Sequence, residues 1–255
     1  MISLAIIFAL FMIISIFYLI TAIRYGSLIV KNLFSTKVIL ALWVSIASST
    51  IVMAISLLFG IPLSWVLAHK DFKSKSVIET LIVDVPHSFP PGVVGTVYLL
   101  MFQSSDLFGM ILEALGFQLI NTFWAMILVK TFISAPFLVS ILTAKLRDIR
   151  KSELEIIAKS LGASDFKVFI TITYPLSKKT IVAGSARCWA RALGEIAGTI
   201  VFAGAIIPGI TQTMPAIIVF EAQTSLPEAL TLALILASFS ITILVILKVI
   251  MERSD

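Results

Sequence analysis

The chain has 255 residues, of which 59% are hydrophobic and 13% are charged, and its formal net charge is +5. This composition excludes an ordinary soluble domain and predicts an all-α integral membrane protein with a single transmembrane domain over residues 1–255. One cysteine excludes an internal disulfide framework, and two histidines far apart in the sequence argue against a zinc site. The basic residues lie between apolar segments, which indicates cytoplasmic loops rather than a nucleic-acid surface. Neither a cofactor nor a metal is expected.

Six apolar segments are long enough to cross a hydrocarbon core of about 30 Å at about 1.5 Å per residue. Their predicted bounds are about 2–23, 38–68, 77–103, 122–144, 178–203 and 228–250, with a loop at 145–177. The first segment lacks the basic start and the cleavage site of a secretion signal, so it is interpreted as a span. In the second segment, Gly60 and Pro62 offer a place to kink. Three lysines against one aspartate between the second and third spans predict a cytoplasmic loop.

The third span is interrupted by V-D-V-P-H-S-F-P-P-G at residues 83–92. Each proline removes a backbone donor, and a broken helix in a membrane needs protein or water to satisfy the freed carbonyls. This span is therefore expected to face the protein interior or a cavity. Asp84 and His87 could contact a substrate there, but capping of the broken helix ends is the favoured interpretation.

Residues 104–121 contain two acidic residues and no lysine or arginine, as an external loop should. The fourth span comes next and contains Lys130. A lysine inside a membrane segment is a functional candidate by default. The alternative is that its side chain extends to a polar edge of the bilayer.

The loop after the fourth span is the main basic segment, with eight basic and four acidic residues from Lys145 to Lys179. It is predicted to be cytoplasmic, and counting spans in both directions places both termini in the cytoplasm. Arg24, Lys31 and Lys37 then fall in an external loop, against the positive-inside rule. The orientation of the first span therefore stays open.

A polar helix is predicted from Glu153 to Ser160, with one apolar face. Gly162 is expected to close it, Ser164 to cap a second helix, and Pro175 to stop that second helix. A helix-turn-helix between two spans suits docking into a groove on a soluble partner. The alternative is an amphipathic loop that lies on the membrane surface.

This stretch resembles the cytoplasmic coupling loop of binding-protein-dependent ABC transporter permeases, whose signature is Glu-Ala-Ala, three residues, Gly, and later Leu-Pro. Alignment on Gly162 puts Ile156, Ile157 and Ala158 at the Glu-Ala-Ala positions, with Glu155 one place early. Tyr174 and Pro175 take the place of Leu-Pro. The resemblance implies that the loop couples the membrane domain to an ATPase through Glu153, Glu155, Ala158, Leu161, Gly162, Ala163, Asp165, Phe169 and Pro175.

The fifth span contains A-R-C-W-A-R-A-L-G-E, in which Arg187, Arg191 and Glu195 recur every four residues. On a helix they would form one stripe about 12 Å long, and Arg191 could pair with Glu195. Charges this deep are costly against lipid, so the stripe should face a partner helix or an aqueous path. A network that only orients the span in the bundle is the alternative.

The fifth span leads into G-A-I-I-P-G-I-T-Q-T-M-P at residues 204–215, whose prolines and Gly209 break the helix and whose threonines offer hydroxyls. The order R-A-L-G-E, F-A-G, P-G-x-T-x-T-x-P resembles the molybdate and tungstate permeases, with the sulfate permeases as near relatives. The resemblance implies a translocation path or gate that includes Arg187, Arg191, Glu195, Pro208, Gly209, Thr211 and Thr213.

The sequence has no G-x-x-x-x-G-K-[ST] motif, so the chain does not bind a nucleotide by that means and is not expected to be an enzyme. The resemblance implies an importer with two cytoplasmic ATPase subunits, an extracytoplasmic oxyanion-binding protein and a second permease copy, in which a homodimer gives twelve spans. Sulfate or another small anion is the alternative substrate. A secondary transporter would show inverted repeats, and an intramembrane enzyme would show clustered catalytic groups; neither pattern is seen.

Overall fold

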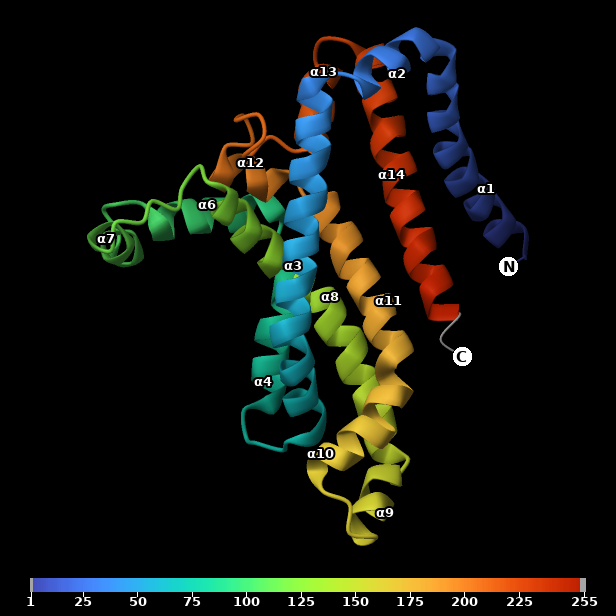
Figure 1. Cartoon of the computed structure of the whole chain (residues 1–255), viewed down its shortest axis with the longest axis vertical. Helices are drawn as coiled ribbons and strands as arrows, with labels where there is room; N and C mark the ends of the chain where they lie inside the picture. Colours follow the sequence, from blue (N-terminus) through green and yellow to red (C-terminus); the bar gives the residue numbers. More distant parts are fainter. Residues whose placement is uncertain (1, 253–255) are drawn as a thin grey trace.

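The computed structural model describes residues 2–252, and every regular element among them is helical (Figure 1). The elements in chain order are α1 (Ile2–Tyr18), η1 (Leu19–Tyr25), α2 (Gly26–Leu33), α3 (Thr36–His69), α4 (Lys75–Glu79), η2 (Thr80–Asp84), α5 (Val85–Ser88), α6 (Pro91–Phe102), α7 (Leu107–Ala114), α8 (Phe123–Lys151), α9 (Leu154–Ser160), α10 (Asp165–Val168), η3 (Phe169–Thr173), α11 (Tyr174–Leu193), α12 (Ala197–Ala203), α13 (Met214–Ala222) and α14 (Leu226–Glu252). The prediction of an all-α membrane protein is confirmed.

Four helical segments are long and apolar enough to cross a membrane: Leu4–Leu33, α3, α8 and Leu226–Ile246 of α14. A fifth is added if α6 and α7, which meet at 58°, count as one bent span. The described helices therefore do not show six continuous spans, because the third and fifth predicted spans consist of shorter helices. α3, in contrast, continues through Gly60 and Pro62 from Thr36 to His69.

The centre of the molecule is a bundle of α3, α8 and α11 (Figure 1). Small residues allow these helices to approach closely, as is common in membrane bundles. A Cβ atom on Gly184 of α11 would lie 2.7 Å from Leu138 Cδ1 of α8, and one on Gly60 of α3 would lie 3.2 Å from Val139 Cγ2. Leu138 of α8 therefore packs against Gly184 of α11, and Val139 of α8 packs against Gly60 of α3.

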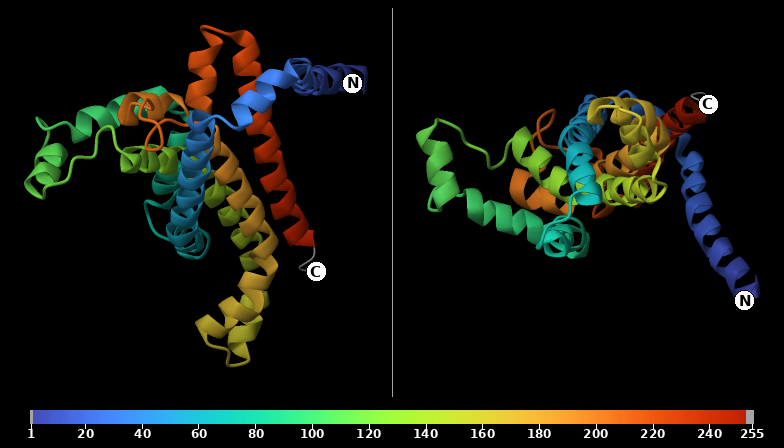
Figure 2. Two further views of the ribbon diagram at one scale, coloured as in Figure 1. Left: turned by 45° about the horizontal axis from the view of Figure 1, so that its top comes forward. Right: turned by 90° about the horizontal axis from the view of Figure 1, so that it is seen from below.

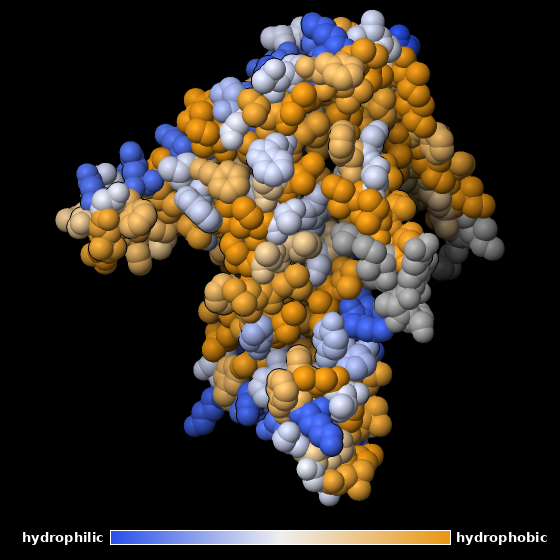
Figure 3. Space-filling view, in the orientation of Figure 1, coloured by the Kyte–Doolittle hydropathy of each residue, from blue (hydrophilic) through white to orange (hydrophobic). Residues whose placement is uncertain are grey.

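The other elements extend away from this bundle. α1 projects on one side and the α6–α7 pair on the other (Figure 2). Most described side chains of α1 are exposed, among them Leu4, Ile7 and Phe11. In Figure 3 hydrophobic residues cover the middle of the visible face, while hydrophilic residues gather at its upper and lower ends. This distribution is typical of a protein whose middle zone lies in lipid.

Two π-helical segments, η2 and η3, each precede a proline. The amide of Val85 bonds to Thr80 O and the amide of Tyr174 bonds to Phe169 O, each five residues back. Pro86 comes directly after Val85 in the first turn of α5, and Pro175 comes directly after Tyr174 in the first turn of α11. The wider turn accommodates the proline ring, which would clash with a carbonyl in a regular α-helix. The prediction that Pro175 stops the helix is therefore wrong.

The predicted break in the third span is confirmed, because α5 ends at Ser88 and α6 begins at Pro91. The capping interpretation is wrong for Asp84, whose side chain is exposed and makes no cap hydrogen bond. His87 is also exposed, and its ring packs edge-on against Phe137 at a centroid distance of 4.5 Å.

Candidate functional site

The coupling loop predicted at 145–177 includes the last turn of α8, the short helices α9 and α10, η3 and the start of α11, at the lower end of Figure 1. Gly162 has a φ of 87°, so it ends α9 as predicted. Ser164 caps α10, since its hydroxyl accepts a hydrogen bond from the amide of Lys167 at 3.3 Å. Glu153 precedes α9 with a φ of 61°. The end of the first helix and the start of the second are therefore at the residues that the sequence predicts, while α9 begins one residue later than predicted, at Leu154.

The outer side of this loop is apolar and uncovered. Leu161 is 83% exposed and Phe166 is 74% exposed, and Leu154, Ile156 and Ile157 are exposed as well. Scattered exposed apolar residues need no explanation, but several large ones on one short loop are typical of an interaction surface, although Lys159, Asp165 and Lys167 are exposed among them. We call these five residues the docking face.

Glu155 does not belong to the docking face, because its side chain turns inward and the residue is only 8% exposed. Its Oε1 accepts a hydrogen bond from the Thr173 hydroxyl, and its Oε2 lies 2.8 Å from Nε2 of His69. The other ring nitrogen of His69 lies 3.1 Å from the carbonyl oxygen of Trp65. Glu155 therefore joins α9 to the end of α3 and to η3.

The remaining predicted loop residues lie around this contact. Ala158, Ala163 and Phe169 are half-buried, while Glu153, Asp165 and Pro175 are exposed. Asp165 pairs with Lys159 at 2.7 Å, and the hydrogen bond from that lysine lowers the pKa of the carboxyl. The loop is thus held by its own ion pair as well as by Glu155.

A second ion-pair group joins the α3–α4 loop to the end of α8. Asp71 Oδ2 lies 2.8 Å from an Arg150 guanidinium nitrogen, and Asp71 Oδ1 lies 3.1 Å from Lys75 Nζ. The hydrogen bonds from Arg150 and then from Lys75 lower the pKa of Asp71 to about 2. The ends of α3 and α8 next to the coupling loop are therefore tied together.

The charged residues of the fifth predicted span lie where its helix breaks. Arg187 is exposed and Arg191 is partly buried on α11, but that helix ends at Leu193, so Glu195 lies beyond it. The predicted pair is confirmed, with Arg191 Nη1 3.2 Å from Glu195 Oε2. Glu195 is 2% exposed, and its Oε1 also accepts the amide of Gly198 at 2.7 Å. The carboxylate thus satisfies a donor that the break would leave unpaired.

Lys130 is also part of this centre. It is 0% exposed, and its Nζ donates to the Ser48 hydroxyl of α3 at 2.8 Å. The interpretation that it extends to the bilayer edge is therefore wrong. Sequence analysis missed Ser45 and Ser48, although the series S-I-A-S-S places serines on one face of α3.

The loop before α13 completes the centre. The Thr211 hydroxyl accepts the amide of Ile207 at 3.2 Å, and the amide of Met214 donates to Ser45 Oγ at 2.8 Å. Thr211 and Thr213 are fully buried, and the Thr213 hydroxyl has no hydrogen-bond partner among residues 2–252. Pro208 and Gly209 lie at the outer turn of the loop, where Pro208 is exposed and Gly209 has a φ of 75°.

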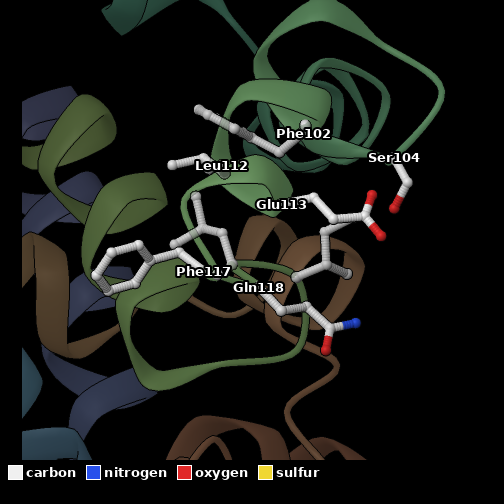
Figure 4. A pocket seen from close by; sticks show the side chains of 10 residues that line it. Phe102, Ser104, Leu112, Glu113, Phe117 and Gln118 are labelled. Carbon is white, nitrogen blue, oxygen red and sulfur yellow. The ribbon is translucent and has the colours of Figure 1, made fainter.

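A cavity of about 320 Å³ lies between α6, α7 and the segment that leads to α8 (Figure 4). Figure 4 shows Glu113 and Gln118 beside Phe102, Leu112 and Phe117. The lining contains a carboxylate and no lysine or arginine. The carboxylate makes this cavity unfavourable for an anion.

A helical membrane protein with a docking face at one end and buried charges at its centre belongs to the class of multi-pass membrane permeases. The profile of the family described as "Binding-protein-dependent transport system inner membrane component" matches residues 60–255. The chain belongs to this family.

The similar proteins include permease proteins of oxyanion transport systems. The molybdate/tungstate transport system permease protein WtpB of Thermococcus kodakarensis is 31% identical over 228 residues, which cover 89% of this chain and 85% of that protein. The sulfate transport system permease protein CysW of Synechococcus elongatus is 31% identical over 225 residues, with coverages of 88% and 77%. A bacterial ABC transporter involved in the import of alginate has a chain with a TM-score of 0.65 and 17% identity, with coverages of 89% and 83%. The structural similarity shows a common fold.

Proposed function

We propose that this chain is the membrane-spanning permease subunit of an ABC importer that moves molybdate or tungstate into the cytoplasm. The observation that carries the proposal is the docking face, in which Leu161 and Phe166 are exposed on a loop that is continuous with α8 and α11. The choice of substrate is supported by the similarity to a molybdate/tungstate permease over 89% of the chain.

Energy reaches the membrane domain through this loop. Each of two permease copies seats α9 and α10 in a cleft of one cytoplasmic ATPase subunit. α8 leads into the loop and α11 leads out of it, so movement of the ATPase pair changes the position of both bundle helices. Glu155 extends the connection to α3 through His69.

A homodimer in the cell membrane provides the enclosure for the path, and an extracytoplasmic oxyanion-binding protein delivers the substrate at the α2–α13 end. Both termini then lie in the cytoplasm, because α1 and α14 run away from that end in Figure 1. Two of the three basic residues that this topology places outside lie next to acids. Lys37 is 2.7 Å from Glu221, and Lys31 is 3.9 Å from Glu228.

Arg187 and Arg191 make the path favourable for a dianion, and Glu195 keeps Arg191 paired when the path is empty. Burial strengthens this pair relative to an exposed one, because solvent screens it less. The hydroxyls of Thr211 and Thr213 lie in the loop between α12 and α13, at the outer end of the path, where Pro208 and Gly209 form the turn.

An importer of sulfate or another small anion is the alternative, supported by the similarity to a sulfate permease. Selectivity in such systems is expected to reside mainly in the binding protein. The two substrates therefore have to be separated by measurement.

The test is uptake into proteoliposomes that contain this chain with its cognate ATPase, with the binding protein and ATP added. Tungstate, molybdate, sulfate and phosphate are compared, and omission of ATP is the control. We expect ATP-dependent accumulation of tungstate or molybdate in preference to sulfate. Accumulation of sulfate alone would establish the alternative, and accumulation independent of ATP would contradict the importer proposal.

A further inference from the structure

Lys130 has unused capacity to bind an anion. An ammonium group has three donors, and the structure gives Nζ one hydrogen bond, to Ser48 Oγ. The residue is fully buried about 10 Å from the start of α8. A buried cation without a full set of acceptors is costly, so it is retained where function needs it.

Lys130 has no carboxylate as a hydrogen-bond partner. Glu195, the buried acid nearest to it in the bundle centre, already has both oxygens hydrogen-bonded, to Arg191 and to the amide of Gly198. Among the described residues the other buried acid is Glu155, which belongs to the predicted coupling loop. The hydrogen-bond partner of Lys130 is therefore a neutral hydroxyl, that of Ser48.

Two buried hydroxyls without partners lie on α8 and on α12, which packs against α8. Ser134 is one helical turn from Lys130 on the same face of α8. Thr199 comes directly after Gly198, and a Cβ atom on Gly198 would lie 2.6 Å from Val129 Cγ1, next to Lys130. Ser134 and Thr199 are fully buried, and neither hydroxyl has a hydrogen-bond partner in the described part of the chain. Buried polar groups without partners are rare, and each requires an explanation.

We propose that Lys130 is the cationic contact of the transported oxyanion at an occluded position between α3, α8 and α12. Ser134 and Thr199 donate hydroxyl hydrogen bonds there, while the Ser48 hydroxyl donates to the carbonyl oxygen of Ser45 and accepts from Lys130. Ammonium and hydroxyl donors together suit a tetrahedral oxyanion. Lys130 has no exposed surface, so the position is closed in this structure. It opens when α12 moves away from α8. The inference rests on the proposed function.

The test compares four variants in the proteoliposome assay: Lys130→Met, Lys130→Arg, Glu195→Gln and the double variant Lys130→Met with Glu195→Gln. We expect Lys130→Met to lower ATP-dependent uptake at least about tenfold, as for loss of a charge-assisted hydrogen bond, and Lys130→Arg to retain most uptake. The double variant leaves no unpaired charge between these two residues, and its uptake should stay at least about tenfold below that of Glu195→Gln alone.

Lys37→Met is the matched control, because Lys37 is an exposed lysine that is paired with Glu221 near the first residue of α3. Uptake by this variant should be unchanged. Copurification of the ATPase shows that each variant is assembled. If the double variant transports as well as Glu195→Gln, Lys130 only balances a charge and the inference is wrong. If the unmodified chain transports none of the oxyanions, the proposed function fails instead.

Discussion

The variant Gly162→Val tests whether the backbone conformation of the predicted coupling loop matters for transport. Gly162 has a φ of 87°, and a Cβ atom there would meet no other atom within 4 Å. The substitution therefore causes no clash, but it places a β-branched residue in the left-handed region. That conformation costs about 1–2 kcal/mol for a residue with a side chain. The loop conformation that presents the docking face should become about 5–30-fold less populated relative to its alternatives.

We expect ATP-dependent uptake to fall by about that factor, while the membrane bundle stays folded. Uptake and ATP hydrolysis are measured on the same proteoliposomes, and thermal unfolding checks the bundle. Gly116→Val is the matched control, because Gly116 has a φ of 77° and also has no atom within 4 Å of the added Cβ. It lies before α8, at the opposite end of that helix from the coupling loop. Normal uptake by Gly162→Val, or an equal loss in both variants, would refute the coupling role.

Three further predictions concern the ion pairs. The double variant Arg191→Ala with Glu195→Ala should lower oxyanion uptake, and full transport would contradict the gate. Glu155→Gln should weaken copurification of the ATPase several-fold, because a neutral amide makes weaker hydrogen bonds than a carboxylate; unchanged copurification would mean that Glu155 does not position the loop. Since Arg150 helps to hold the pKa of Asp71 at about 2, the contribution of this pair is present above the unfolded pKa of about 3.9 and lost as the pH falls toward 2. The protection of the α3–α4 loop amides against hydrogen exchange, measured relative to the intrinsic exchange rate at each pH, should therefore fall below pH 4 in the unmodified chain and be low already at pH 7 in Asp71→Asn.

Local signals in the sequence are sufficient for much of the fold. The apolar runs predict α3 and α14 nearly to their ends, because length and hydropathy decide whether a helix crosses a membrane. They predict the start of α8 but not its end, since α8 continues past the predicted residue 144 to Lys151. The predictions for Gly162 and Ser164 are confirmed because the roles of these residues depend on backbone conformation and on hydrogen bonds three residues away. The prediction for Pro175 is wrong because a π-helical turn before it keeps the helix continuous.

The site depends on contacts between residues far apart in the chain. Glu155 meets His69, 86 residues earlier, and no periodicity within the loop indicates that partner. Lys130 meets Ser48, 82 residues earlier, and no pattern around the lysine identifies the serines of α3 as its counterpart. Hydrophobic patterns specify which side of a helix is buried, but they do not specify which polar group on another helix it reaches.

The two π-helical segments also determine how far the helices that follow them are rotated about their own axes. A π-turn contains one more residue than the α-turn it replaces, and each residue of an α-helix turns the chain by about 100°. Deleting one residue from η3 would keep the helix continuous but would rotate α11 by about that angle relative to the coupling loop. Arg191 would then leave the interior of the bundle. The additional residue before Pro175 therefore sets the rotation of α11 relative to the predicted coupling loop.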